Sequence, residues 1–188
     1  MEKPKEILLY DTTLRDGLQG QGLNMSVAEK IKAVCLLDEL GIPYIEAGFL
    51  GSNPKDRELF DRLQSLDVSS KIVAFGMTCK KDTRVEDDEH VQDLVSSWVN
   101  TITVVGKTWG LHIEKVLETS REENLRMIVD TIRALKTVDK EVVYDAEHFF
   151  DAYKDDPDYS RECLVAAREA GADYLTLCDT NGASLPEL

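Results

Sequence analysis

Short apolar segments alternate with longer segments of helical periodicity along almost the whole chain. Each apolar segment is rich in Val, Ile, Leu, Tyr or Phe and is too short for a core helix, so each predicts a β-strand. The predicted strands are residues 6–11, 44–48, 71–77, 101–105, 141–145 and 174–178. Strands that alternate with helices imply a parallel sheet with right-handed crossovers.

Helix start and stop signals lie between most of these strands. Ser26 and Glu29 form a capping box at the start of one helix, and Gly41 ends it. The predicted apolar face of this helix consists of Ile31, Val34, Leu37 and Leu40. The remaining signals are Asn53-Pro54, Ser120 with Glu123 before a helix to about Thr137, Pro157 before a helix that closes at Gly171, and a shorter segment, 88–97.

Two architectures fit this order of elements. One is an open doubly wound sheet, which six strands in 188 residues would complete. The other is a (β/α)8 barrel, which needs eight strands and typically about 250 residues. Length by itself therefore favours the open sheet.

Composition excludes several classes of function. The chain has 22 Lys and Arg against 36 Asp and Glu, a formal net charge of −14, so a nucleic acid would be repelled. No apolar run approaches the roughly 20 residues of a membrane helix, and the first residues lack the apolar core of a signal peptide. The expectation is a cytoplasmic protein with no membrane partner, whose four irregularly spaced cysteines are reduced thiols.

Polar residues recur where the predicted strands end. In both candidate folds the carboxyl ends of parallel strands meet at the edge that holds the active site. The residues in question are Asp11, Arg15 and Asp16 after the first strand, Glu46 within the second, His112 after the fourth, Tyr144, Glu147 and His148 at the fifth, and Asp179, Thr180 and Asn181 at the sixth.

These side chains offer a coherent set of chemical groups. Asp16 offers a hard oxygen ligand to a divalent metal, and Arg15 could stabilise a developing enolate or alkoxide. Glu147 and Glu46 are candidate groups for proton transfer. Simpler interpretations stay open: Asp16 could belong to an Asp-Gly turn, and Glu46 could be a buried acid that pairs with Arg15. By the same reasoning, His148 and His90 face solvent or pack locally. No G-x-G-x-x-G, P-loop or G-x-S-x-G motif supports a dinucleotide, triphosphate or serine-hydrolase function.

The segment Asp-Thr-Thr-Leu-Arg-Asp-Gly-Leu-Gln at 11–19 resembles the signature of the DRE-TIM metallolyases, which include isopropylmalate, citramalate and homocitrate synthases and hydroxymethylglutaryl-CoA lyases. The resemblance extends over essentially the whole chain. The segments that look most like the bacterial citramalate synthase branch are 51–56, 106–109, 144–151 and 177–182.

The resemblance implies roles for individual residues. Arg15, Asp16 and Glu46 match the Asp-Arg-Glu set that names the superfamily. By this likeness Asp16 is a metal ligand, Arg15 holds the substrate oxyanion, and Glu46 supports the arginine or relays a proton. Glu147 matches the glutamate proposed to help abstract the acetyl methyl proton. The positions that match the substrate pocket or the signature are His112, Tyr144, Thr180 and Gln19.

The implied reaction is a Claisen-type condensation of acetyl-CoA with a 2-oxoacid, here pyruvate to give citramalate, in the biosynthesis of branched-chain amino acids such as isoleucine. The implied cofactor is a divalent metal, Mg, Mn or Zn. The full-length protein is expected to be a homodimer. Isopropylmalate synthase shares nearly all of these residues, and homocitrate synthase is disfavoured because it usually carries glutamate where Asp16 stands.

Two departures from the family pattern bear on this interpretation. The other metal ligands of the family come from a His-x-His pair on a later strand, and no His-x-His occurs in this sequence. Six strands are predicted, not eight. Residues 1–188 are therefore expected to be the N-terminal part of a catalytic TIM barrel, about its first six strands, which binds metal weakly and does not turn over by itself. The alternatives are a non-catalytic interaction module and a complete doubly wound domain that binds a small anion.

Overall fold

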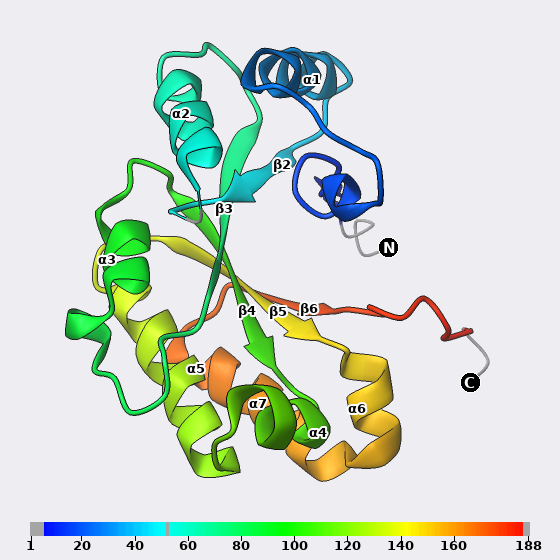
Figure 1. The fold of residues 1–188 in the computed structure, drawn as a ribbon, viewed down its shortest axis with the longest axis vertical. Helices are drawn as coiled ribbons and strands as arrows, with labels where there is room; N and C mark the ends of the chain where they lie inside the picture. The colour runs from blue at the N-terminus through cyan, green and yellow to red at the C-terminus, as the bar shows by residue number, and fades with distance from the viewer. Residues whose placement is uncertain (1–5, 52, 186–188) are drawn as a thin grey trace, which may run out of the picture. The chain divides into compact units, whose positions relative to one another are not determined.

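A computed structural model describes residues 6–51 and 53–185, so Ser52, within one of the segments of resemblance, lies outside the described residues. The chain divides into two compact units. Unit 1 comprises Met1–Phe75 with Trp98–Asn100, and unit 2 comprises Gly76–Ser97 with Thr101–Leu188. Each unit contains strands and helices in alternation (Figure 1).

Unit 1 contains three parallel strands in the order β1-β2-β3. Its elements are β1 (Tyr10–Asp11), the 3-10 turn η1 (Gly17–Gln19), α1 (Val27–Glu39), β2 (Tyr44–Phe49), α2 (Pro54–Leu63) and β3 (Lys71–Met77), whose last two residues belong to unit 2. The pairing of β2 with β3 shifts register between Glu46 and Gly48. The second and third strands predicted from the sequence are thus confirmed.

The first strand is much shorter than predicted. Residues 6–9 have no regular structure, and Ile7, Leu8 and Leu9 are exposed. The pairing begins with Tyr10 opposite Tyr44, where β2 itself begins. The residues just before Tyr44 form a turn, and Pro43 has no N–H to donate. Residues 6–9 therefore have no extended part of β2 beside them with which to pair.

Helix α1 begins and ends as predicted. Ser26 and Glu29 form the reciprocal capping box. Gly41 has a φ of 77°, and its N–H and that of Ile42 bond back into the last turn, as in a glycine-terminated helix. The prediction that Leu40 belongs to the buried face is wrong: it is 76% exposed, because the helix ends at Glu39 and Leu40 follows its last turn.

Helix α2 also begins at the predicted signal, with Asn53 accepting a hydrogen bond from the N–H of Asp56. The side chain of Asp56 turns back to α1, where its carboxylate accepts a hydrogen bond from Lys30 at 3.0 Å. Both side chains of this ion pair are almost fully buried, so the pair fixes the two helices of unit 1 to each other.

Unit 2 contains the parallel strands β4-β5-β6 in chain order. Its elements are η2 (Val85–Asp87), α3 (Glu89–Ser96), β4 (Thr101–Lys107), α4 (Gly110–His112), the π-helical turn η3 (Ile113–Leu117), α5 (Arg121–Lys136), β5 (Glu141–Glu147), α6 (Phe149–Asp155), α7 (Pro157–Ala170) and β6 (Tyr174–Leu177). The three strands and α3, α5 and α7 confirm the predictions to within two residues; α6 and the turns around 110–117 were not predicted.

The two faces of β4 and β5 differ in character. Ile102, Val104 and Tyr144 are fully buried on the face that packs against α5 and α7, which lie side by side (Figure 1). The other face carries Lys107 and Glu147, directly opposite each other in the register. Helix cover on one face and polar groups at the strand ends are the arrangement of a β/α barrel wall.

Strand β6 is the last strand of unit 2 and has exposed side chains throughout: Tyr174 is 41%, Leu175 37% and Leu177 44% exposed. Within the described part of the chain, no helix combines the length and the apolar character needed to cross a membrane.

Candidate functional site

The turn after β1 holds the polar residues of unit 1. The N–H groups of Arg15, Asp16 and Gly17 all point to the carbonyl oxygen of Thr12, at 3.2, 2.9 and 3.1 Å. This tight turn directs the Arg15 side chain back over β2. There its guanidinium lies 4.0 Å from the centre of the Phe75 ring, within range of a cation–π interaction.

Arg15 and Glu46 form a buried ion pair. The Nε of Arg15 donates to Glu46 Oε1 at 2.5 Å, and the Tyr10 hydroxyl donates to the second carboxylate oxygen at 2.6 Å. The Glu46 side chain is 1% exposed, so these two donors replace the water that the carboxylate would otherwise bind. The interpretation of Glu46 as the partner of Arg15 is therefore confirmed.

Asp16 extends this network to the surface. One of its carboxylate oxygens lies 3.3 Å from Arg15 Nη1, and its side chain is 61% exposed. Arg15 thus lies between a buried and an accessible carboxylate. Gln19, at the end of η1, is exposed and belongs to the same unit.

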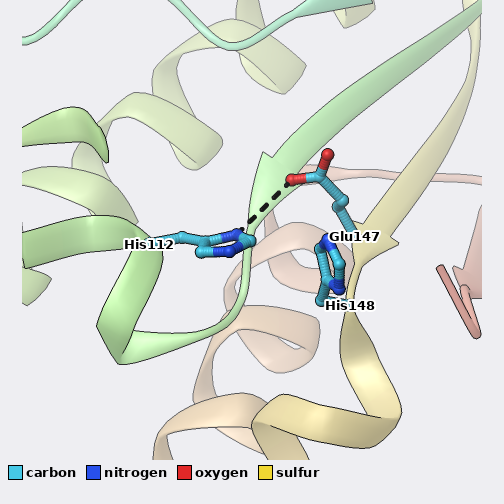
Figure 2. A group of neighbouring side chains, drawn as sticks. All are labelled: His112, Glu147 and His148. Carbon is cyan, nitrogen blue, oxygen red and sulfur yellow. Dashed lines mark ion pairs between the residues drawn. The ribbon is translucent and has the colours of Figure 1, made fainter. Parts of the chain in front are cut away.

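A second group of polar residues occupies the ends of β4 and β5 in unit 2. Lys107 Nζ donates to Glu147 Oε2 across the two strands. His112, from the short helix after β4, brings its Nδ1 to 4.0 Å from the same carboxylate oxygen. Both Glu147 and His112 are partly buried, and Figure 2 shows the His112 ring facing the Glu147 carboxylate. The same carboxylate thus contacts an ammonium group and an imidazole.

His148 completes this group. Its backbone is left-handed, with a φ of 54°, a conformation uncommon for residues other than glycine. Its N–H donates to the hydroxyl of Thr180 at 2.9 Å, and its ring meets the His112 ring edge to face at 4.7 Å. Thr180 therefore contacts the group through the backbone of His148. The expectation that His148 packs locally or faces solvent missed its place beside Glu147.

His112 is a poor proton carrier at neutral pH. Burial lowers its pKa, and the neighbouring His148 and Lys107 lower it further, although Glu147 acts in the opposite direction. The lowered pKa favours the neutral imidazole, which is the form that binds a metal. Its Nδ1 and that of His148 are buried without a hydrogen-bond partner among the described residues.

Tyr144 lies on the opposite side of β5 from Glu147. Its side chain is fully buried, and burial raises its pKa well above the ordinary value. The ring packs so closely on Gly106 of β4 that a Cβ there would meet it at 2.6 Å. Successive residues of a strand alternate between faces, so positions 144 and 147 point in opposite directions. The structure does not bring Tyr144 together with the other predicted site residues.

The structure thus forms two groups, one in each unit. Arg15, Asp16 and Glu46 belong to unit 1. His112, Glu147 and Thr180 belong to unit 2. So do His148, which the sequence analysis expected to face solvent or pack locally, and Lys107, to which it gave no role. Lys107 could have been identified from the sequence, because it ends the strand before the one that Glu147 ends. Residues at the ends of adjacent parallel strands lie opposite each other. The proposal that both groups serve one reaction stays a prediction.

The implied metal fits this chain in part. Asp16 offers an accessible oxygen ligand, but the His-x-His pair that the resemblance requires is absent from the sequence. Among the described residues, one group of possible ligands is close enough to share an ion, namely His112, Glu147 and His148.

Comparisons with known proteins agree on a family. The family described as HMGL-like matches residues 6–188. (R)-citramalate synthase of Synechocystis is 45% identical over 185 residues, which is 98% of this chain and 34% of that protein. 2-Isopropylmalate synthase of Methanocaldococcus jannaschii is 34% identical over 183 residues, 97% of this chain and 33% of that protein. The chain spans about a third of the length of the curated relatives it matches.

A comparison with solved structures supports the same fold. The crystal structure of the HMG-CoA lyase of Bacillus subtilis matches with a TM-score of 0.75 at 18% identity, covering 100% of this chain and 62% of that one. The predicted fold class, the first six strands of a TIM barrel, is therefore confirmed. The doubly wound sheet that length favoured is wrong, because the strands of each unit pair in chain order without the reversal of a doubly wound sheet.

Proposed function

The chain belongs to the HMGL-like family, the DRE-TIM metallolyases, and from that membership we propose that it is part of an enzyme that condenses acetyl-CoA with a 2-oxoacid. In this proposal residues 1–188 are the N-terminal part of the catalytic barrel of an acyltransferase. The observation that supports it is that Glu147 lies at the end of β5 and its carboxylate contacts both Lys107 and His112.

We further propose pyruvate as the acceptor and citramalate as the product. Relatives named (R)-citramalate synthase are 43–45% identical to this chain, against 34% for the 2-isopropylmalate synthase. Pyruvate and 2-oxoisovalerate differ by two methyl groups, and a pocket distinguishes such groups by about 1–3 kcal/mol per methylene. The acceptor is therefore decided by assay, and 2-isopropylmalate synthase is the second candidate.

The proposed roles follow the chemistry of each group. Asp16 would contribute one oxygen ligand to a divalent metal, which when bound polarises the keto group of the acceptor. Arg15 would stabilise the negative charge that develops on the keto oxygen, and Glu46 would hold the guanidinium in place. Gln19 and Thr180 are proposed to contact the substrate or to support its loops.

Proton transfer is assigned to unit 2. Glu147 Oε1 or Oε2 takes a proton from the acetyl methyl group, and the resulting enolate carbon attacks the keto carbon of the 2-oxoacid. Water then hydrolyses the thioester and releases CoA. Lys107 and His112 hold the Glu147 carboxylate from two sides, so its orientation is set before substrate binds.

The experiment is a CoA-release assay of the complete protein with acetyl-CoA and Mg²⁺ or Mn²⁺. Pyruvate, 2-oxoisovalerate and 2-oxoglutarate are compared as acceptors. We expect pyruvate to give the highest kcat/KM, and Glu147→Gln to lower kcat by about 10²–10⁴-fold, as for the loss of a general base. Glu114→Gln, at an exposed position of η3, is the matched control and should leave kcat unchanged.

Two results would contradict this proposal. Higher kcat/KM with 2-oxoisovalerate would assign the protein to the isopropylmalate branch. Absence of CoA release with every acceptor would favour the non-catalytic alternative, an interaction module. A homodimer in the cytoplasm, where acetyl-CoA is available, is part of the proposal, and light scattering of the complete protein tests the dimer.

A further inference from the structure

We propose that His112, Glu147 and His148 form a binding site for a zinc-class transition metal, separate from the Asp16 ligand assigned above. One ligand atom from each residue lies within 4.8 Å of the others. Figure 2 shows the three side chains grouped together, with His112 facing the carboxylate of Glu147 at the end of β5 and His148 next to it. A metal ion here would occupy the Glu147 carboxylate to which proton transfer is assigned above, so it would compete with the proposed condensation, and its test measures metal binding instead of activity.

The spacing suits a small ion after a modest movement of side chains. Zinc binds imidazole nitrogen and carboxylate oxygen at about 2.0–2.2 Å, so the ligand atoms of a tetrahedral site lie about 3.3 Å apart. The ligand atoms, now within 4.8 Å of one another, would have to move closer by rotation of the side chains when an ion binds. Three protein ligands leave the fourth position to water or another small ligand, as in open zinc sites.

Two buried nitrogen atoms support a cation at this site. The Nδ1 atoms of His112 and His148 are buried without a hydrogen-bond partner in the described residues, although Asp151 brings a carboxylate oxygen to 3.5 Å from the Nδ1 of His148. A buried polar atom without a hydrogen bond destabilises the fold, and coordination of a cation would give each nitrogen a partner. The two rings are only 4.7 Å apart, so one ion can serve both.

The backbone holds His148 in its position. Its left-handed φ of 54° is fixed by the hydrogen bond from its N–H to Thr180. Strained backbone of this kind persists where the surrounding structure determines it, and it occurs often at ligand sites. The Trp109 ring packs beside both imidazoles, with ring centres 5.1 Å from His112 and 5.9 Å from His148.

The ligand set selects the class of metal. Two imidazoles and one carboxylate suit Zn²⁺, Co²⁺ or Ni²⁺, whereas Mg²⁺ prefers oxygen ligands and retains its water. Lys107 opposes the metal, because its ammonium group already pairs with Glu147. The proposal therefore predicts opposite effects of two substitutions on the zinc affinity. Loss of the His148 side chain should weaken zinc binding, and loss of the Lys107 charge should strengthen it.

The test is a titration of the purified protein with Zn²⁺, followed by calorimetry and by long-range ¹H–¹⁵N spectra of the histidine rings. An Asp16→Asn background removes the other assigned ligand. We expect one zinc ion to bind and to shift the ring nitrogens of His112 and His148, while those of His90 stay unchanged. His148→Gln should weaken the affinity by about 100-fold. Lys107→Gln should raise it.

His90→Gln is the matched control, because His90 is the third histidine of this chain and its Nε2 accepts a hydrogen bond from Met77 instead of facing Glu147. It should bind zinc as the parent does. The proposal is overturned if zinc leaves the spectra of His112 and His148 unchanged. It is overturned equally if His148→Gln and His90→Gln bind with the parent affinity, or if Lys107→Gln weakens binding.

Discussion

At the scale of single residues, the buried ion pair of Arg15 and Glu46 makes stability depend on one cation. Removal of Arg15 leaves a carboxylate that is 1% exposed, and among the described residues the Tyr10 hydroxyl is its one remaining donor. We therefore expect Arg15→Gln to lower the free energy of unfolding by about 3 kcal/mol, as for other broken buried pairs. Urea unfolding followed by circular dichroism measures this loss.

Arg84 supplies the control for that measurement. It pairs with Glu86 at 3.3 Å, but both side chains are largely exposed, so Arg84→Gln should cost less than about 1 kcal/mol. Equal losses for the two variants would show that the Glu46 carboxylate does not need its partner.

Asp38 gives unit 1 a dependence on pH. The Ser70 hydroxyl and N–H both donate to its Oδ1 at 2.7 Å, and these hydrogen bonds lower the pKa of Asp38 below its ordinary 3.8. A carboxyl whose pKa is lower in the folded state stabilises the fold above its unfolded value and loses that effect as pH falls. Asp38→Asn should therefore be less stable than the parent at pH 7, with the difference shrinking below pH of about 3.8.

A second substitution, Ser70→Ala, tests whether the Ser70 hydroxyl causes this dependence on pH. In that background the Asp38→Asn change should lose much of its pH dependence, because the hydroxyl donor to the carboxylate is gone. Urea midpoints measured at several pH values for the four proteins complete the cycle. A pH-independent difference between the parent and the Asp38→Asn variant would rule out this explanation.

At the scale of elements, the pairing of β4 with β5 depends on a glycine. A Cβ at Gly106 would meet the Tyr144 ring at 2.6 Å, and that ring is fully buried and has no space to retreat. We expect Gly106→Ala to cost about 1–3 kcal/mol of unfolding free energy, the usual penalty for overpacking. Gly17→Ala is the control, because its Cβ would meet nothing closer than 3.8 Å. Comparable urea midpoints for both variants would contradict this prediction.

The elements that the sequence predicted are those with local signals. Capping residues such as Ser26 and Ser120, and Gly171 after α7, mark helix ends through hydrogen bonds within a few residues. Helix α6 was missed because it follows His148, which is left-handed and offers no side-chain cap. The first strand was overestimated because strand formation depends on a partner that the local sequence does not show.

The site residues also divide into those with a signal in the local sequence and those without one. Glu147 was predicted from its place at a strand end, and Glu46 with Arg15 from the cost of a buried acid. Tyr144 lies buried on the other face of β5 from Glu147, as its parity along the strand indicates, and its role in substrate binding stays a prediction. The approach of His148 to His112 could not be predicted, because 35 residues of intervening chain carry no spacing that relates the two rings.

At the scale of the whole molecule, the acidic excess should make stability depend on salt. The net charge is −14, so the excess carboxylates repel one another, most strongly in the compact folded state. Raising NaCl from about 0.01 M to about 1 M shortens the screening length from about 30 Å to about 3 Å, so the urea midpoint at pH 7 should rise. The rise should shrink near the sequence pI of 4.6, where the net charge vanishes. A midpoint that falls with salt at pH 7 would show that attractive ion pairs outweigh the repulsion.

Strand β6 decides how residues 1–188 would behave in concentrated solution if they were produced without the rest of the proposed barrel. Its exposed tyrosine and leucines lie on the last strand of the unit 2 sheet, whose outer backbone groups can pair with another extended segment. Pairing of β6 with another copy of the polypeptide would lower the solubility as the protein concentration rises. Turbidity of this isolated polypeptide is therefore expected to originate at Tyr174–Leu177, and a lysine introduced there should reduce it.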